Sequence, residues 1–100
     1  MERLNTRKID EHGRMVLPIE LRKKEKWDFG EKLTFTQIKN VGILHSSDES
    51  YEPKWVDVRI DELGRINIPP EIRRELEWMF NSEVDLFADG EFVFLRKKQD

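Results

Sequence analysis

Two arginines carry the clearest chemistry in this sequence. Arg14 and Arg65 each follow a glycine in two stretches, residues 9–22 (IDEHGRMVLPIELR) and 60–73 (IDELGRINIPPEIR), that are identical at eight of fourteen positions. A guanidinium holds its N–H donors in a planar fork, which fits a phosphate or the edge of a guanine base. The repeat therefore predicts two equivalent cationic groups that project from rigid turns.

More basic residues follow each of these arginines. Arg22 and Lys23 come after the first, and Arg73 and Arg74 after the second, at the end of a predicted helix. If a pseudo-two-fold axis relates the two halves, these sets form symmetric clusters on one face. That layout matches a DNA duplex whose half-sites are related by a dyad.

Each turn arginine also has a structural interpretation. Arg14 can pair with Asp10, and Arg65 with Asp61, across the turn. A surface ion pair of this kind contributes at most about 1 kcal/mol. The pairing accounts for the turn arginines but not for the basic residues that follow them.

The sequence shows little that could catalyse a reaction. His12 and His45 lie far apart, and the chain has no cysteine to complete a zinc site. Asp10, Glu11 and His12 are the only conceivable metal or acid–base cluster. The second copy replaces the histidine by Leu63 and keeps the rest of the turn. We therefore expect no catalytic residue, no metal and no cofactor, and an enzyme is the least expected class.

The repeat also predicts the elements that position these side chains. Apolar residues alternate through 56–60, and Gly13 and Gly64 supply the positive φ of a tight turn. Pro18 and Pro69 suit the first turn of a helix. Each half is thus predicted to open as strand, turn, strand and short helix.

Each half is predicted to close with a β-hairpin. In the second half, strands at 84–88 and 92–94 flank Asp89-Gly90, a strong signal for a two-residue turn, and residues 33–44 form the counterpart. Trp27 and Phe29 recur at the same offset as Trp78 and Phe80, which predicts that all four are packing anchors. Residues 46–54 are polar and predict a linker, after which Trp55 begins the next strand.

Composition limits the remaining choices. A chain of 100 residues buries roughly 60–70% of its unfolded surface, so each half would be marginal alone and we expect a shared core. The absence of cysteine and of a long apolar run predicts a cytoplasmic protein without a membrane partner. The net charge of −3 argues against indiscriminate polyanion binding.

The motif residues resemble a known family. Residues 7–22 are similar to the N-terminal DNA-binding domain of the AbrB/SpoVT transition-state regulators, and residues 59–74 resemble a second copy. The MraZ and MazE-like proteins are related to the same family. The resemblance implies a mostly β fold with two short helices, a swapped-hairpin AbrB-like (cradle-loop) barrel built from two β-β-α-β-β repeats as an intrachain pseudo-dimer. It places one barrel domain at 1–100, with repeat one at 6–45, the linker at 46–54 and repeat two at 55–97.

The resemblance also implies a function and a set of site residues. The implied function is a sequence-specific DNA-binding transcription regulator that contacts double-stranded DNA, with a second copy of the chain or a toxin-like protein as further candidate partners. The alternative is a protein-interaction module, antitoxin-like or adaptor, on the same barrel. Asp10 and Asp61 match turn-stabilising acids of the family. The implied DNA-binding residues are Arg7, Lys8, Arg14, Arg22, Lys23, Arg59, Arg65, Arg73 and Arg74.

The two copies differ in their charge. Val58 stands where the first copy has Arg7, and Glu75 and Glu77 make the end of the second helix more acidic. We therefore expect the second copy to hold DNA less well than the first.

Overall fold

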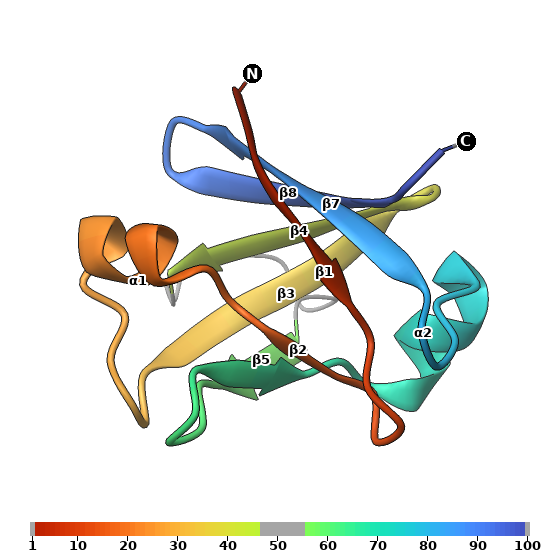
Figure 1. The fold of residues 1–100 in the computed structure, drawn as a ribbon, viewed down its shortest axis with the longest axis horizontal. Coiled ribbons are helices and arrows are strands. Elements are labelled where there is room, and N and C mark those ends of the chain that lie inside the picture. The colour runs from red at the N-terminus through yellow and green to blue at the C-terminus, as the bar shows by residue number, and fades with distance from the viewer. Residues whose placement is uncertain (1, 47–55, 100) are drawn as a thin grey trace.

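The computed structural model describes residues 2–46 and 56–99, and over these ranges the element order β-β-α-β-β occurs twice (Figure 1). The first half contains β1 Glu2–Lys8, β2 Arg14–Val16, α1 Ile19–Glu25, β3 Lys32–Ile38 and β4 Val41–Ser46. The second contains β5 Val56–Arg59, β6 Arg65–Asn67, α2 Pro70–Leu76, β7 Glu83–Asp89 and β8 Phe92–Lys97. The prediction of a mostly β chain with two short helices is confirmed. Apart from Ser46, the predicted linker lies outside the described residues, and so does Trp55.

Strands from the two halves are interleaved in the sheets. One sheet has the order β1-β7-β8-β4-β3-β5, and β2 pairs with β6 in a second, two-stranded sheet. The first strand of each half pairs with the third strand of the other, as Lys8 with Glu83 and Arg59 with Lys32 show. The two closing hairpins, β3–β4 and β7–β8, are formed as predicted and meet side by side through β4 and β8.

The predicted tight turns are present, but the strands that they join do not pair as hairpins. Gly13 has φ 81° and Gly64 has φ 78°, the left-handed region that glycine tolerates. The N–H of Asp10 donates to the carbonyl of Arg14 at 2.9 Å, which closes the first turn. Outside the turn, β1 pairs with β7, and β2 pairs with β6. An alternating apolar pattern shows that one face of a strand is buried, but it does not identify the neighbouring strand.

The buried side chains of both halves form one cluster. Trp27 is 2% exposed and Trp78 1%, so the prediction of two tryptophan anchors is confirmed. Phe35 of the first half meets Trp78 of the second edge to face, with ring centroids 6.3 Å apart. The prediction was wrong for Phe29 and Phe80, which are 72% and 64% exposed. Each lies two residues after its tryptophan, where the chain turns away from the core.

Among the described residues, no helix is long and apolar enough to cross a membrane.

Candidate nucleic-acid interface

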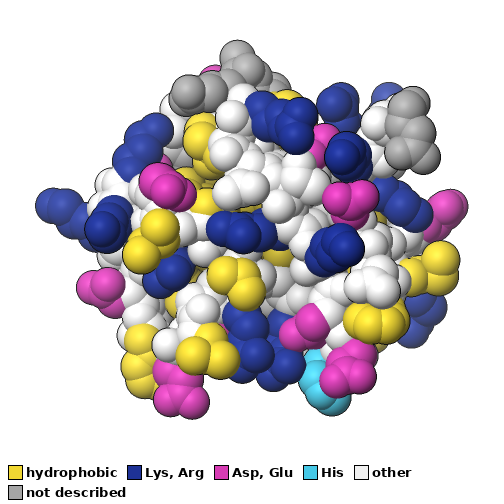
Figure 2. Space-filling model, in the orientation of Figure 1, with side chains coloured by type: hydrophobic (Ala, Val, Ile, Leu, Met, Phe, Trp, Pro, Cys, Tyr) yellow, Lys and Arg dark blue, Asp and Glu magenta, His cyan; other side chains and the backbone are white. Residues whose placement is uncertain are grey.

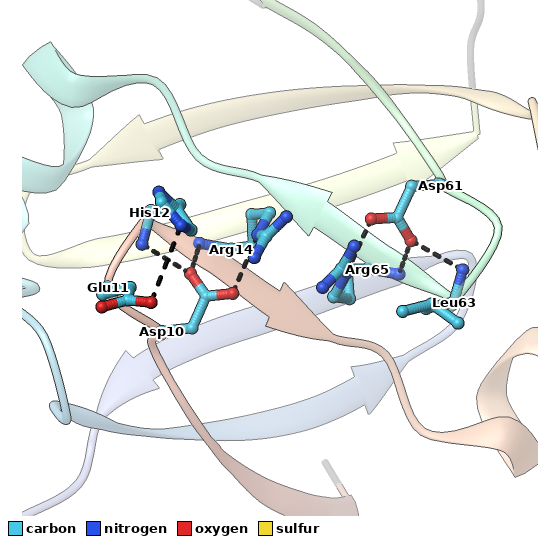
Figure 3. A network of polar contacts seen from close by, with 7 residues as sticks. All are labelled: Asp10, Glu11, His12, Arg14, Asp61, Leu63 and Arg65. Atoms are coloured by element: carbon cyan, nitrogen blue, oxygen red, sulfur yellow. Dashed lines mark hydrogen bonds and ion pairs between the residues drawn. The ribbon is translucent and has the colours of Figure 1, made fainter.

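The two-stranded sheet brings the repeated arginines together. In β2 and β6, Met15 faces Ile66, and both are buried at 1% or less. Side chains alternate between the faces of a strand, so the neighbours of these two residues point to the other face of the ribbon. Figure 3 shows Arg14 and Arg65 lying between the two turns. The solvent-facing residues of the ribbon are Arg14, Val16, Arg65 and Asn67.

Asp10 fixes both the first turn and its arginine. One carboxylate oxygen, Oδ1, accepts the backbone N–H groups of His12 at 2.9 Å and of Arg14 at 2.8 Å. The other, Oδ2, accepts the Nε–H of Arg14 at 2.8 Å. The predicted ion pair and the predicted role of Asp10 as a turn-stabilising acid are confirmed.

Asp61 repeats this network in the second turn (Figure 3). Its carboxylate accepts the backbone N–H groups of Leu63 and Arg65, both at 2.9 Å, and the Nε–H of Arg65 at 2.7 Å. Among the described residues, no hydrogen bond or ion pair engages the terminal Nη groups of Arg14 or Arg65. Each aspartate therefore holds its arginine by Nε and leaves the terminal fork available to a ligand.

The carboxylates of both turns are held in their ionised form. Burial raises the pKa of Asp10, but hydrogen bonds from the backbone and side chain of Arg14 and from His12, together with the charge of Arg14, outweigh burial and lower the pKa below 3.8. For Asp61, burial again opposes ionisation, and Arg65 is the main cause of a lowered pKa. A group whose pKa is lower in the folded state contributes stability above its unfolded pKa, and this contribution disappears as the pH falls through the folded pKa.

We expect the melting temperature to fall as the pH is lowered from about 4 toward 2, because protonated Asp10 and Asp61 no longer bind the turn arginines as anions. The double variant Asp10→Asn, Asp61→Asn should lose part of this acid dependence. Melting curves at pH 7 and pH 3 measure it. Glu11→Gln is the control, because the Glu11 side chain is 74% exposed. An equal drop in the double variant and the parent would contradict the assignment.

The histidine of the first turn contributes through its backbone. Within the described part of the chain, the His12 ring meets only Glu11, at 3.7 Å, and both side chains are more than 60% exposed. Leu63 supplies the same backbone N–H in the second turn. Within residues 2–46 and 56–99, no group of three or more His, Asp or Glu residues could hold a metal ion.

Arg22 and Arg73 each extend to the turn of the opposite half. Both are half-buried, and each lies against the turn glycine of the other half rather than in solvent. The Nε–H of Arg22 donates to the carbonyl of Leu17 at 3.2 Å, and that of Arg73 to Ile68 at 2.9 Å. Sequence spacing placed these residues near the interface but could not show that they cross to the opposite half.

The remaining candidate residues fall into two groups. The first group is exposed and consists of Lys8, Lys23, Arg59 and Arg74. Within it, Arg59 donates to the carbonyl of Gly30 at 3.0 Å. Arg7 differs from them. It faces Val84 across the β1–β7 ladder, and its Nε is buried without a hydrogen-bond partner among the described residues. Its counterpart in β5, Val58, is 4% exposed, so Arg7 occupies a position that is apolar in the second half.

Charge of both signs is interspersed on the surface. On the face shown in Figure 2, Lys and Arg side chains are separated by Asp and Glu, and no continuous basic sheet covers it.

The structure defines a small antiparallel β-rich protein with a paired-arginine ribbon. No protein-family model matches the chain. It is 41% identical over 39 residues to "Putative transition state regulator Abh" of Bacillus subtilis (strain 168). The match covers 39% of this chain and 42% of Abh, so it spans less than half of either protein.

A solved structure shares the fold. The solution structure of PHS018 from Pyrococcus horikoshii matches with a TM-score of 0.51 and 18% sequence identity, and the match covers 100% of both chains. At this identity the similarity concerns the fold alone.

Proposed function

We propose that this chain is a sequence-specific DNA-binding transcription regulator of the AbrB/SpoVT type. The observation that carries the proposal is the ribbon of β2 and β6, which presents Arg14 and Arg65 on one face with their Nε atoms held by aspartates. The similarity to Abh supports it. The regulator would act in the cytoplasm on double-stranded DNA, without a cofactor and without catalysis.

The domain architecture belongs to the same proposal. The interleaving of strands from the two halves supports a swapped-hairpin barrel at 1–100, formed by two tandem copies within one chain. In this arrangement one chain supplies the two related sets of DNA-binding residues that a dimer of single-copy chains would supply. A pseudo-two-fold axis through the ribbon then matches a duplex with dyad-related half-sites.

The geometry suggests a division of labour among the basic residues. A two-stranded ribbon fits the major groove, where the fork of an arginine can bind guanine O6 and N7. Arg14 and Arg65 would make these base contacts. The exposed residues Lys8, Lys23, Arg59 and Arg74 would contact phosphates, which fix position rather than sequence.

Selection of bound sequences from a random pool of duplexes, followed by a salt titration, tests the proposal. If these four exposed residues each neutralise one phosphate, affinity should fall by roughly a hundredfold between about 50 and 200 mM salt. Lys23→Ala should make the salt slope shallower by about 1. Lys39→Ala, at the turn between β3 and β4, is the control and should leave the slope unchanged. A flat salt response, or no retained duplex at low salt, would overturn the proposal.

A groove elsewhere on the surface favours the alternative of a protein-interaction module. It has a volume of about 480 Å³ and lies where the β3–β4 turn meets β7 and β8, and Figure 1 shows β8 far from β2. Arg96 lies 5.2 Å above the ring of Phe87. The described residues that line the groove are apolar or cationic, apart from one amide: Ile38, Lys39, Asn40, Val41, Ile43, Phe87, Phe94 and Arg96.

The positive charge of this groove indicates which kind of partner would bind there. Neither Lys39 nor Arg96 has an ion pair among the described residues, so the groove would complement an acidic, apolar segment of a partner protein. A fluorescent peptide of alternating leucine and glutamate is the probe. Binding that is lost in Lys39→Glu, Arg96→Glu supports the alternative, and concentration-dependent self-association without peptide binding would assign the groove to a second copy.

A further inference from the structure

We infer that Arg22 and Arg73 are positioning residues, each of which holds the arginine-bearing turn of the opposite half in place. The DNA-binding role of those turns rests on the proposed function, but the contacts themselves do not. The resemblance implied that both residues contact DNA. The inference instead assigns them to the protein framework that orients the interface.

The first contact joins α1 to the second turn. A Cβ built on Gly64 would lie 2.6 Å from Cζ, 2.8 Å from Nε and 2.9 Å from Nη2 of Arg22. The guanidinium therefore lies directly against the backbone of Gly64. Its Nε–H donates to the carbonyl of Leu17 at 3.2 Å, while the N–H of Leu17 donates to the carbonyl of Gly64 at 2.9 Å. Arg22, Leu17 and Gly64 thus form a closed set of contacts between the two halves.

The second contact is the reciprocal of the first. A Cβ on Gly13 would lie 2.8 Å from Nη1 of Arg73. The Nε–H of Arg73 donates to the carbonyl of Ile68 at 2.9 Å, and the N–H of Ile68 donates to the carbonyl of Gly13 at 3.0 Å. The same arrangement in both halves, at equivalent positions, indicates a feature of the fold rather than a single chance contact.

This arrangement gives each turn glycine a second task besides its positive φ. Gly13 and Gly64 are buried, although tight turns are ordinarily exposed. A Cβ at either position would displace the guanidinium that lies against it, and the arginine comes from the other half. The positive φ favours glycine, and the absence of a side chain lets the arginine lie directly on the turn.

The contact fixes the turn from which the DNA-facing arginine projects. Gly64 immediately precedes Arg65, and its N–H donates to the carbonyl of Asp61 at 3.0 Å. Arg22 therefore packs on Gly64, the residue that lies between Asp61 and Arg65 in the second turn. Because Arg73 does the same for Arg14, each half of the interface is held by the other half.

Arginine suits this role and lysine does not. A planar guanidinium can lie flat against a peptide while its Nε donates sideways, whereas an ammonium is a compact, strongly hydrated charge without a planar face. Arg22→Lys keeps the charge and loses the contact with Gly64. A residue that only neutralised phosphate would tolerate this change, and a positioning residue would not.

Amide hydrogen exchange tests the inference directly. In Arg22→Lys, the turn amides of Leu63 and Arg65 should exchange roughly fivefold to tenfold faster, the change expected for the loss of about one hydrogen bond. The amides of the first turn should change much less. Arg73→Lys should show the reverse, with faster exchange at His12 and Arg14. Arg22→Gln provides a second variant if the lysine variant folds poorly.

Lys23→Ala is the matched control, because Lys23 is the neighbour of Arg22 on the same helix and is exposed. It should leave exchange in both turns unchanged while making the salt slope of DNA binding shallower. Arg22→Lys should weaken DNA binding with an unchanged salt slope. Unchanged exchange in the 61–65 turn, or equal acceleration in both turns, would overturn the inference. If the protein binds no DNA, the exchange result still stands, so the two proposals fail separately.

Discussion

The fragments 1–50 and 51–100 are expected to be unfolded or self-associated when each is produced alone. In the described ranges 2–46 and 56–99, β1 pairs with β7, β5 pairs with β3, and β2 pairs with β6. A separated half therefore exposes strand edges as well as the apolar faces of its tryptophan and of its closing hairpin. A half of this size also buries too little surface to offset its chain entropy.

Circular dichroism and sedimentation of the two fragments measure this effect. A mixture of both fragments is the informative control, because the missing strand partners then become available and native-like structure should return. The complete chain should unfold in a single cooperative transition. A soluble, stably folded monomer of either fragment would show that the halves do not depend on each other.

Replacement of both Arg14 and Arg65 by alanine is expected to abolish specific DNA binding. Each arginine presents an uncommitted Nη fork on the ribbon, and a bidentate contact to a base contributes about 1–3 kcal/mol. Arg14→Ala should cost more than Arg65→Ala. The two networks have nearly the same geometry, with Nε–Oδ2 distances of 2.8 and 2.7 Å, so the difference is expected from the more acidic helix of the second half.

Affinity and melting temperature measured together separate the two roles of these arginines. Both alanine variants should remain folded, because a surface ion pair contributes at most about 1 kcal/mol. Arg14→Lys is the matched control, since it retains the charge but loses the fork and should lose sequence preference more than total affinity. Unchanged affinity in both alanine variants, or a large fall in melting temperature, would mean that the arginines are structural.

The two tryptophans and two phenylalanines show how far the repeat alone could predict burial. All four occupy equivalent positions, so the sequence treats them as one kind of anchor. The structure buries Trp27 and Trp78 and leaves Phe29 and Phe80 exposed. Identical spacing shows that the two tryptophans are equivalent to each other, and likewise the two phenylalanines. Whether each kind of residue faces the core depends on where the chain turns after the helix.

Features controlled by neighbouring residues could be predicted from the sequence. The Asp-Glu-x-Gly-Arg turn is closed by hydrogen bonds within five residues, and the Asp10–Arg14 pair needs nothing outside that span. The two helices and the closing hairpins likewise follow from local signals. These elements could be predicted because their hydrogen bonds lie between residues close together in the chain.

Features that involve distant residues could not be predicted, because they depend on how the two halves pack together. The alternation of apolar residues through 56–60 is satisfied by any partner that covers one face, and the fold pairs β5 with β3 of the other half. Arg22 and Lys23 are adjacent and alike in charge, yet one packs on Gly64 and the other faces solvent. Successive residues point in different directions around a helix, and which of them meets the opposite turn depends on how the two halves dock.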